Sequence, residues 1–249
     1  MCGFAGVINK TKKINNNQLK KLASEVDFRG PDFSGIEVYD RIFQKQDVGQ
    51  IGLFHNRLAI IDLDQRSNQP FEDESYVLLY NGEIYNFEEL KSDLVSKGII
   101  FKTKSDTEVL FEGLKYYKDD FIQLLNGIFS FVFIDKLNMT ALMSRDRLGI
   151  KPLYYYIDSE QIIFSSEMNT VIRLKISKNI ISRESIDNYM LFQYIPTPMT
   201  MIENIYKVKP GYVYNVSLLD NKLSYENKYW DAFKSRSSSN IQNLENFIY

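Results

Sequence analysis

The chain contains very few of the residues that build disulfides and metal sites. Its 249 residues include one cysteine, one histidine and one tryptophan. A single cysteine excludes a disulfide within the chain, as is usual in a reducing compartment. One cysteine and one histidine are also too few for a zinc site of the Cys/His kind, which needs three or four such ligands. We therefore expect a cytoplasmic protein without metal ligands.

Long apolar runs and an excess of one charge are also missing. No stretch reaches the ~18 consecutive apolar residues that a membrane span needs, and the N-terminus lacks the basic and apolar regions of a signal peptide. The 30 basic and 32 acidic residues nearly cancel, and no long basic block is present, so we expect neither a membrane nor a nucleic-acid partner. The length and the 44% hydrophobic content fit one large globular domain or two small ones.

The one cysteine stands in the opening sequence Met1-Cys2-Gly3-Phe4-Ala5-Gly6. We expect removal of Met1, because cysteine is small, and this leaves an α-amine and a thiol on the same residue. The amine has a pKa of about 7.7–8.0 and the thiol one of about 8.5. Near neutral pH an unprotonated amine can therefore take the proton of its own thiol, directly or through one water. Position alone also allows an unreactive cysteine at a frayed end.

Strand-like segments alternate with a few helical ones along the chain. Helical spacing or capping signals mark residues 16–26, 86–98, 105–114 and 182–192. Turn signals are Arg29-Gly30-Pro31-Asp32 and Asn81-Gly82. Strands are predicted at residues 3–9, 51–55, 58–63, 77–80, 128–135, 139–145, 153–157, 161–165, 212–218 and 222–230. Hairpins of this kind predict an α+β fold, with antiparallel sheets and helices on their outer faces.

Several polar residues have the chemistry that a free amino acid requires of a pocket. Arg57 could hold an α-carboxylate bidentately, and Glu83 and Asp106 could hold an α-ammonium. The Asn81 amide and the Gly82 N–H could stabilise the oxyanion of an acyl transfer. The residue types alone also permit a surface cation, a plain turn, and a carboxylate placed by the helix dipole.

His55 leaves two interpretations open. A histidine can activate a cysteine nucleophile, so a Cys2/His55 hydrolase is one of them. The other is a structural histidine before a strand. Replacing His55 by alanine separates the two, because only the first requires the imidazole for catalysis.

Seven motifs occur in order along the chain. They are Cys2-Gly3-Phe4-Ala5-Gly6, Arg29-Gly30-Pro31-Asp32, His55-Asn56-Arg57-Leu58-Ala59-Ile60-Ile61-Asp62, Asn81-Gly82-Glu83-Ile84-Tyr85-Asn86, Ser105-Asp106-Thr107-Glu108, Arg145-Asp146-Arg147-Leu148-Gly149-Ile150-Lys151-Pro152-Leu153-Tyr154-Tyr155 and Ser165-Ser166-Glu167. This set resembles the glutaminase half of glutamine-hydrolysing asparagine synthetases, a branch of the class II, N-terminal-nucleophile amidotransferases. The resemblance covers roughly residues 2–231.

The resemblance implies a fold and a role for each matching residue. The fold is a four-layer αββα sandwich of two antiparallel sheets. Cys2 would be the nucleophile and its own amine the base, and Asn81 and Gly82 would form the oxyanion hole. Arg57 would bind the glutamine α-carboxylate, and Glu83 and Asp106 would bind the α-amino group. The residues that would line the site beside Arg57 are Leu58, Ala59, Ile60 and Ile61.

The resemblance also indicates what lies outside this sequence. Such synthetases continue into a domain that uses ATP and Mg²⁺ and carries a Ser-Gly-Gly-x-Asp-Ser phosphate loop, which is absent here. We expect an amidotransferase domain at residues 2–231, and at residues 232–249 a linker with the truncated start of a synthetase domain. No cofactor is expected in this chain. L-Glutamine and a synthetase domain are the expected partners, and a homodimer stays open.

The ammonia acceptor is not fixed by these residues. Aspartate, giving asparagine, is the acceptor that the resemblance implies. A sugar acid in surface-polysaccharide synthesis is an alternative, because relatives of these synthetases amidate other carboxylates. A catalytically silent interaction module is a further alternative, and an ammonia-release assay distinguishes it from the enzyme.

Overall fold

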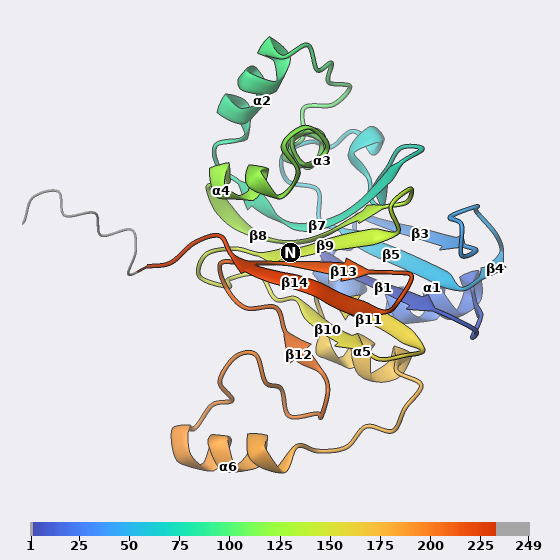
Figure 1. Ribbon diagram of the computed structural model, residues 1–249. Coiled ribbons are helices and arrows are strands. Elements are labelled where there is room, and N and C mark those ends of the chain that lie inside the picture. Colours follow the sequence, from blue (N-terminus) through green and yellow to red (C-terminus); the bar gives the residue numbers. More distant parts are fainter. Residues whose placement is uncertain (1, 233–249) are drawn as a thin grey trace, which may run out of the picture.

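The computed structural model describes residues 2–232, and its main feature is a pair of six-stranded antiparallel sheets (Figure 1). The first sheet has the order β12 (Tyr206–Lys207), β10 (Tyr154–Ile157), β11 (Gln161–Ser165), β1 (Gly3–Asn9), β5 (Ile51–Arg57) and β3 (Phe33–Tyr39). The second has the order β14 (Lys222–Lys228), β13 (Tyr212–Ser217), β9 (Thr140–Arg145), β8 (Gly127–Asp135), β7 (Tyr76–Ile84) and β6 (Phe71–Glu72). Two short strands, β2 (Ile14–Asn15) and β4 (Val48–Gly49), pair separately.

Helices cover the outer faces of both sheets. The first sheet is covered by α1 (Asn16–Ser24) and α5 (Met168–Leu174), and the second by α2 (Phe87–Ser96), α3 (Asp106–Tyr117) and α4 (Phe121–Leu124). Helix α6 (Arg183–Phe192) lies apart from the sheets (Figure 1). Single 3-10 turns are η1 (Asp27–Arg29), η2 (Gln65–Ser67) and η3 (Lys118–Asp120). The predicted α+β sandwich of four layers, αββα, is therefore confirmed.

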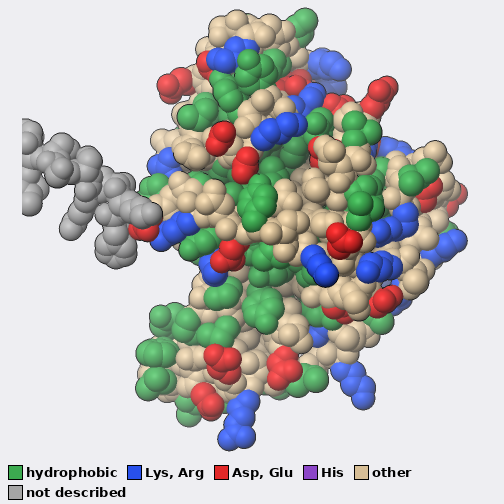
Figure 2. Space-filling model, viewed as in Figure 1, with side chains coloured by type: hydrophobic (Ala, Val, Ile, Leu, Met, Phe, Trp, Pro, Cys, Tyr) green, Lys and Arg blue, Asp and Glu red, His purple; other side chains and the backbone are tan. Residues whose placement is uncertain are grey.

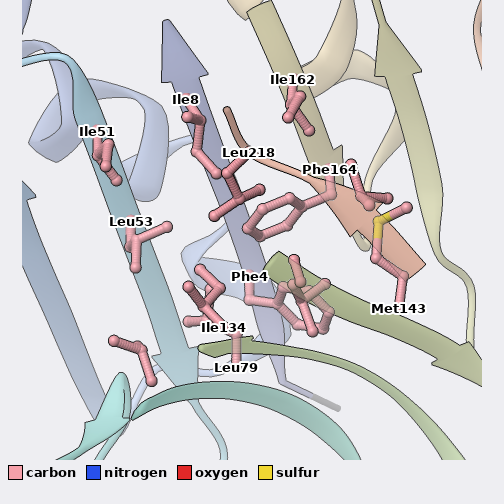
Figure 3. Close-up of a cluster of buried hydrophobic side chains, with 14 of the residues drawn as sticks. Phe4, Ile8, Ile51, Leu53, Leu79, Ile134, Met143, Ile162, Phe164 and Leu218 are labelled. Atoms are coloured by element: carbon pink, nitrogen blue, oxygen red, sulfur yellow. The ribbon is translucent and has the colours of Figure 1, made fainter. Parts of the chain in front are cut away.

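The largest apolar cluster lies between the two sheets. Phe4 and Ile8 of β1 point into it beside Leu53 of β5, Leu79 of β7 and Phe164 of β11 (Figure 3). Strand β1 is central, because it pairs with β11 on one side and β5 on the other. Cys2 directly precedes β1. The packing of β1 in the core therefore fixes the position of the backbone next to Cys2.

Two local predictions were wrong. Asn81-Gly82 is no turn, because it continues β7 and pairs with Ser130 and Phe129 of β8. Residues 58–63 form no strand, and Ile60, Ile61 and Leu63 are exposed. In the first case pairing with β8 overrides a local turn preference. In the second, an apolar run with no sheet neighbour forms a surface loop after β5.

Some of the chain lies outside these residues. The predicted linker and synthetase start at residues 232–249 lie, apart from residue 232, outside the described part of the chain. Within residues 2–232, no helix combines the length and the apolar character needed to cross a membrane.

Candidate active site

Cys2 lies directly before β1 and lines a pocket between the ends of the two sheets. The backbone N–H of Leu58 donates to its Sγ at 3.4 Å, from the segment that follows β5. Burial raises the pKa of the Cys2 thiol, and the Leu58 N–H opposes this rise. A thiol with a raised pKa is neutral near pH 7, so a nucleophilic reaction here requires a nearby proton acceptor.

An arginine from the second motif holds the backbone of the cysteine. The Nε–H of Arg29 donates to the carbonyl oxygen of Cys2 at 3.2 Å, and Nη1 forms an ion pair with Glu167. The remaining guanidinium nitrogen of Arg29, Nη2, is buried and has no hydrogen-bond partner among residues 2–232. Arg29 and Glu167 therefore join two motifs, 138 residues apart, at the nucleophile.

The serines of the last motif hold the next strand residues. Phe4 N–H donates to Ser166 Oγ at 2.9 Å, while Ser165 Oγ and Ser166 N–H donate to Phe4 O at 2.9 and 3.0 Å. Together with Arg29, these bonds fix the main chain on both sides of Gly3. The start of β1, directly after Cys2, is therefore held by side chains as well as by the sheet.

The turn after Arg29 requires a glycine and an aspartate. A Cβ on Gly30 would lie 2.3 Å from Asn56 O, so a larger residue would push the turn away from β5. Asp32 accepts the N–H of Ala59 at 2.8 Å through Oδ2. The motif thus holds the segment after β5 as well as Cys2.

Arg57, at the end of β5, lines the pocket and is largely buried. Its Nη1 donates to Asp64 O at 3.0 Å and to Asn68 Oδ1 at 2.8 Å, and its Nη2 donates to Asp62 O. Nε has no hydrogen bond to any described residue, which leaves Nε–H and one Nη2–H to bind a carboxylate side-on. Arg57 is not the surface cation that its residue type also allowed.

The predicted oxyanion-hole residues lie side by side in β7 and line the same pocket. The side-chain Nδ2 of Asn81 is buried and has no hydrogen-bond partner in the described part of the chain. An unmet buried donor costs roughly 1–3 kcal/mol, and a ligand oxygen bound in this pocket would remove that cost at Asn81. At Gly82 a Cβ would lie 2.3 Å from Ile128 O of β8, which requires glycine.

Acidic groups face the pocket from α3 and β7. Asp106 is the first residue of α3 after its cap, Ser105, and burial raises the pKa of its carboxyl group. Its Oδ2 accepts Tyr80 Oη at 2.7 Å and Ile84 N–H at 3.2 Å. The Glu83 carboxylate lines the pocket and makes no hydrogen bond within residues 2–232. The pair can receive an ammonium group.

The pocket brings together nine of the ten predicted site residues, from four separate motifs. They are Cys2, Arg57, Leu58, Ile60, Ile61, Asn81, Gly82, Glu83 and Asp106. Ala59 does not line the pocket, and its N–H is bound by Asp32. The lining residues that sequence reasoning missed are Asp62, Gln69, Tyr80, Ser105, Thr107 and Lys151.

His55 serves the frame of the site. It is fully buried, its Nε2–H donates to Tyr80 O at 2.9 Å, and it does not line the pocket. Burial lowers its pKa to about 4, so the imidazole is neutral near pH 7. His55 lies within β5 rather than before a strand, and its position favours the structural interpretation over a Cys2/His55 pair.

The long motif that begins at Arg145 builds a loop at the edge of the pocket. Asp146 is buried and accepts the backbone N–H groups of Phe129, Leu148, Ile150 and Lys151. Arg145 Nε donates to Lys151 O at 2.7 Å. Asp146 and Arg145 thus fix the backbone at Lys151, whose side chain lines the pocket. The motif is more than a charged surface loop.

The sequence was compared with models of known protein families. The model of the glutamine amidotransferase domain family matches residues 1–230. The chain belongs to this family. Among residues 2–232 of the amidotransferase domain, no group of three His, Cys, Asp or Glu side chains is placed to hold a metal ion.

Curated relatives of the amidotransferase domain are longer proteins. This chain is 37% identical over 219 residues to "Asparagine synthetase [glutamine-hydrolyzing] 1" of Bacillus subtilis, and the match covers 85% of this chain and 33% of that protein. It is 34% identical over 227 residues to "Putative asparagine synthetase [glutamine-hydrolyzing] 2" of Methanocaldococcus jannaschii, covering 84% and 42%. The chain thus matches less than half the length of either relative.

A solved structure supports the fold of the amidotransferase domain. Glutamine phosphoribosylpyrophosphate amidotransferase of B. subtilis superposes with a TM-score of 0.62 at 17% identity, over 92% of this chain and 49% of that one. At this identity the likeness concerns the fold alone. It agrees with the predicted N-terminal-nucleophile hydrolase architecture.

Proposed function

We propose that this domain hydrolyses the side-chain amide of L-glutamine to L-glutamate and ammonia. The observation that carries the proposal is the unpartnered buried Nδ2 of Asn81, which lines the same pocket as Cys2. A donor in this position can receive the negative oxygen that forms when a thiolate adds to an amide. The acidic pair and Arg57 provide complementary charges for the α-ammonium and the α-carboxylate.

The reaction begins with proton transfer on Cys2. Once Met1 is removed, the α-amine of Cys2 takes the thiol proton, and the thiolate sulfur attacks the amide carbon of glutamine. The raised thiol pKa makes such an acceptor necessary, and His55 is placed elsewhere. The main-chain bond from Arg29 to Cys2 O limits the movement of both reacting groups.

The oxyanion of the tetrahedral intermediate accepts hydrogen bonds from Asn81 Nδ2 and Gly82 N–H. The intermediate then collapses, and the nitrogen leaves as ammonia with the proton held by the amine. Water attacks the resulting γ-glutamyl thioester, which releases glutamate and returns the thiol to Cys2. These steps draw on no metal or organic cofactor, and the expected compartment is the cytoplasm.

In the complete enzyme the ammonia would amidate a carboxylate that ATP has activated. The names of the two relatives support aspartate as that carboxylate and asparagine as the product. ATP and Mg²⁺ would be bound by the ATP-using portion of the enzyme. A sugar acid is the alternative acceptor, and supplying either acid to the complete enzyme with glutamine and ATP distinguishes them by the amide formed.

The test of glutamine hydrolysis uses three forms of the chain. The form whose mass shows loss of Met1 should release glutamate and ammonia from glutamine. The same chain with Cys2→Ala should release neither, and a form in which an added residue blocks the Cys2 amine should be inactive although its thiol is present. Turnover by either altered form would overturn the mechanism, and no turnover by the processed chain would favour the silent module.

A second variant tests the oxyanion hole. Asn81→Ala should lower kcat about 100–1000-fold, the usual cost of losing one oxyanion donor, with little change in the binding of glutamine. An unchanged kcat would remove Asn81 from the mechanism.

A further inference from the structure

Helix α6 buries almost nothing against the rest of the domain. Of its ten residues only Ser185 is buried, and Figure 1 shows the helix set apart from both sheets. It is attached through its flanking segments, where Ser182 N–H donates to Met201 O and Glu203 N–H donates to Ile180 O, both at 2.9 Å. Ser185 Oγ adds a bond of 2.7 Å to Thr200 O.

Five of the ten residues of this helix are apolar and exposed, beside the exposed charged residues Arg183, Glu184 and Asp187. Met190 is 77% exposed and Leu191 73%. Ile186, Tyr189 and Met190 have the i, i+3, i+4 spacing that forms one helical stripe. The exposed apolar residues, here named the α6 face, are Ile186, Tyr189, Met190, Leu191, Phe192 and Tyr194.

Such a helix needs a covering surface. An isolated helix of fewer than about 12–15 residues is marginal in water and gains its stability from tertiary packing. Exposed apolar patches that are contiguous mark interaction sites. Figure 2 shows hydrophobic side chains gathered on the lobe that contains α6 and on the hollow between this lobe and the body of the domain.

The longer relatives contain enough further chain to provide that surface. More than half of each relative lies outside the match, because the match covers 33% and 42% of their lengths. In Figure 1 the described chain leaves β14 at the left of the view, and α6 lies at the bottom left. The use of the ammonia proposed above also requires an ATP-using portion in the complete enzyme.

We propose that the α6 face is the docking surface for the ATP-using portion of the complete enzyme. This inference rests on the proposed function only for the identity of the occupant. Contact at α6 would orient the ATP-using portion relative to this domain. Helix α6 itself contributes no residue to the Cys2 pocket. A second copy of the domain seated on the α6 face is the rival occupant.

The experiment compares the chain alone with a fusion protein. In the fusion, residues 2–231 replace the matched region of B. subtilis asparagine synthetase 1, so that the ATP-using portion is present. Hydrogen exchange of the α6 amides should be at least tenfold slower in the fusion than in the chain alone. The double variant Met190→Glu, Leu191→Glu should lose this protection, although glutamate retains helix propensity.

A matched control separates docking from general surface change. The double variant Ile100→Glu, Leu137→Glu replaces two residues that are 85% and 76% exposed outside the α6 face, and it should keep the protection. Both double variants should hydrolyse glutamine like the parent chain. Loss of glutamine hydrolysis in the parent would count against the proposed function, while the exchange result would still decide the docking surface.

Three results would overturn the docking proposal. One is equal exchange of the α6 amides in the fusion and in the chain alone. Another is unchanged protection in the fusion with Met190→Glu, Leu191→Glu. The third is a dimer of the chain alone, detected by its mass in solution, in which α6 is already protected, because this would assign the surface to a second copy.

Discussion

Helices α3 and α6 both begin with a serine cap, but α3 is largely buried and α6 is largely exposed. Ser105 Oγ accepts the N–H of Glu108 at 3.3 Å, and Ser182 Oγ accepts the N–H of Ser185 at 3.2 Å. Eight of the twelve residues of α3 are buried, compared with one of the ten in α6. Local chemistry therefore starts both helices, whereas only tertiary packing gives α3 its place at the site.

The difference separates two uses of a helix. Packing of α3 against the second sheet holds Asp106 beside Tyr80 and the pocket. Helix α6 positions no pocket residue and leaves its apolar side chains in solvent. The first helix belongs to the catalytic frame, and the second is available to another surface.

The largest contrast is expected in the stability of two matched variants. Leu110→Ala removes a fully buried side chain of α3 and should lower the free energy of unfolding by about 2–5 kcal/mol. Leu191→Ala removes an exposed one from α6 and should change it by less than about 0.5 kcal/mol. Urea denaturation of both variants measures the difference, and equal losses would contradict the burial contrast.

The next effect concerns glutamine binding. Asp106→Asn removes the charge that would face the substrate ammonium under the proposed function, at a cost of about 1.5–3 kcal/mol, which corresponds to a KM about 10–150-fold higher. Because this contact would be made in ground and transition states alike, kcat should change little. Asp187→Asn, at an exposed position of α6, is the control and should leave KM unchanged.

The two caps should differ in what they stabilise. Ser105→Ala should lower global stability by about 1 kcal/mol, because α3 unfolds with the core and Ser105 Oγ also bonds to Thr103 Oγ1 at 2.9 Å. Ser182→Ala should instead speed exchange of the α6 amides about fivefold and leave the global value unchanged. A global loss in both variants would show that α6 unfolds together with the core.

The smallest effect is a pH dependence at α3. Burial raises the pKa of Asp106, and under the proposed function its ionised form would bind the substrate ammonium. KM for glutamine should therefore rise as pH falls through this raised pKa, at a higher pH than for an ordinary aspartate near 3.9. A KM that followed the ordinary aspartate range would contradict the effect of burial.

The same shift has the opposite sign for stability. The folded state binds the Asp106 proton more tightly than the unfolded chain, so its contribution is complete below the unfolded pKa. That contribution is lost as pH rises through the folded pKa. Unfolding measured against pH should lose this dependence in Asp106→Asn, whereas Asp187→Asn should retain it.

Most strands and helices could be predicted because their signals are local. The apolar runs at residues 51–55 and 128–135 are buried strands, Ser105 caps a helix as expected, and a helix follows Ser182 as expected. The Asn81-Gly82 signal failed because β8 lies alongside it and supplies pairing that a turn preference cannot oppose. Local sequence does not contain that neighbour.

The residues that line the pocket could largely be predicted from the sequence, but the contacts that hold them in place could not. Cys2, Arg57, Asn81 and Asp106 have side chains whose chemistry points to a substrate. The ion pair of Arg29 with Glu167 and the bonds from Ser165 and Ser166 to Phe4 join segments far apart in the chain. No spacing rule reports such contacts, because they exist only once β1 and β11 pair.

The central place of β1 also sets a time limit during synthesis. Its second neighbour is β11, where Ser165 pairs with Ala5. At about 5–20 residues per second, a ribosome needs roughly 10–30 s to reach that strand. Until then β1 lacks one of its two neighbours in the first sheet, so this sheet cannot be complete before β11 has been made.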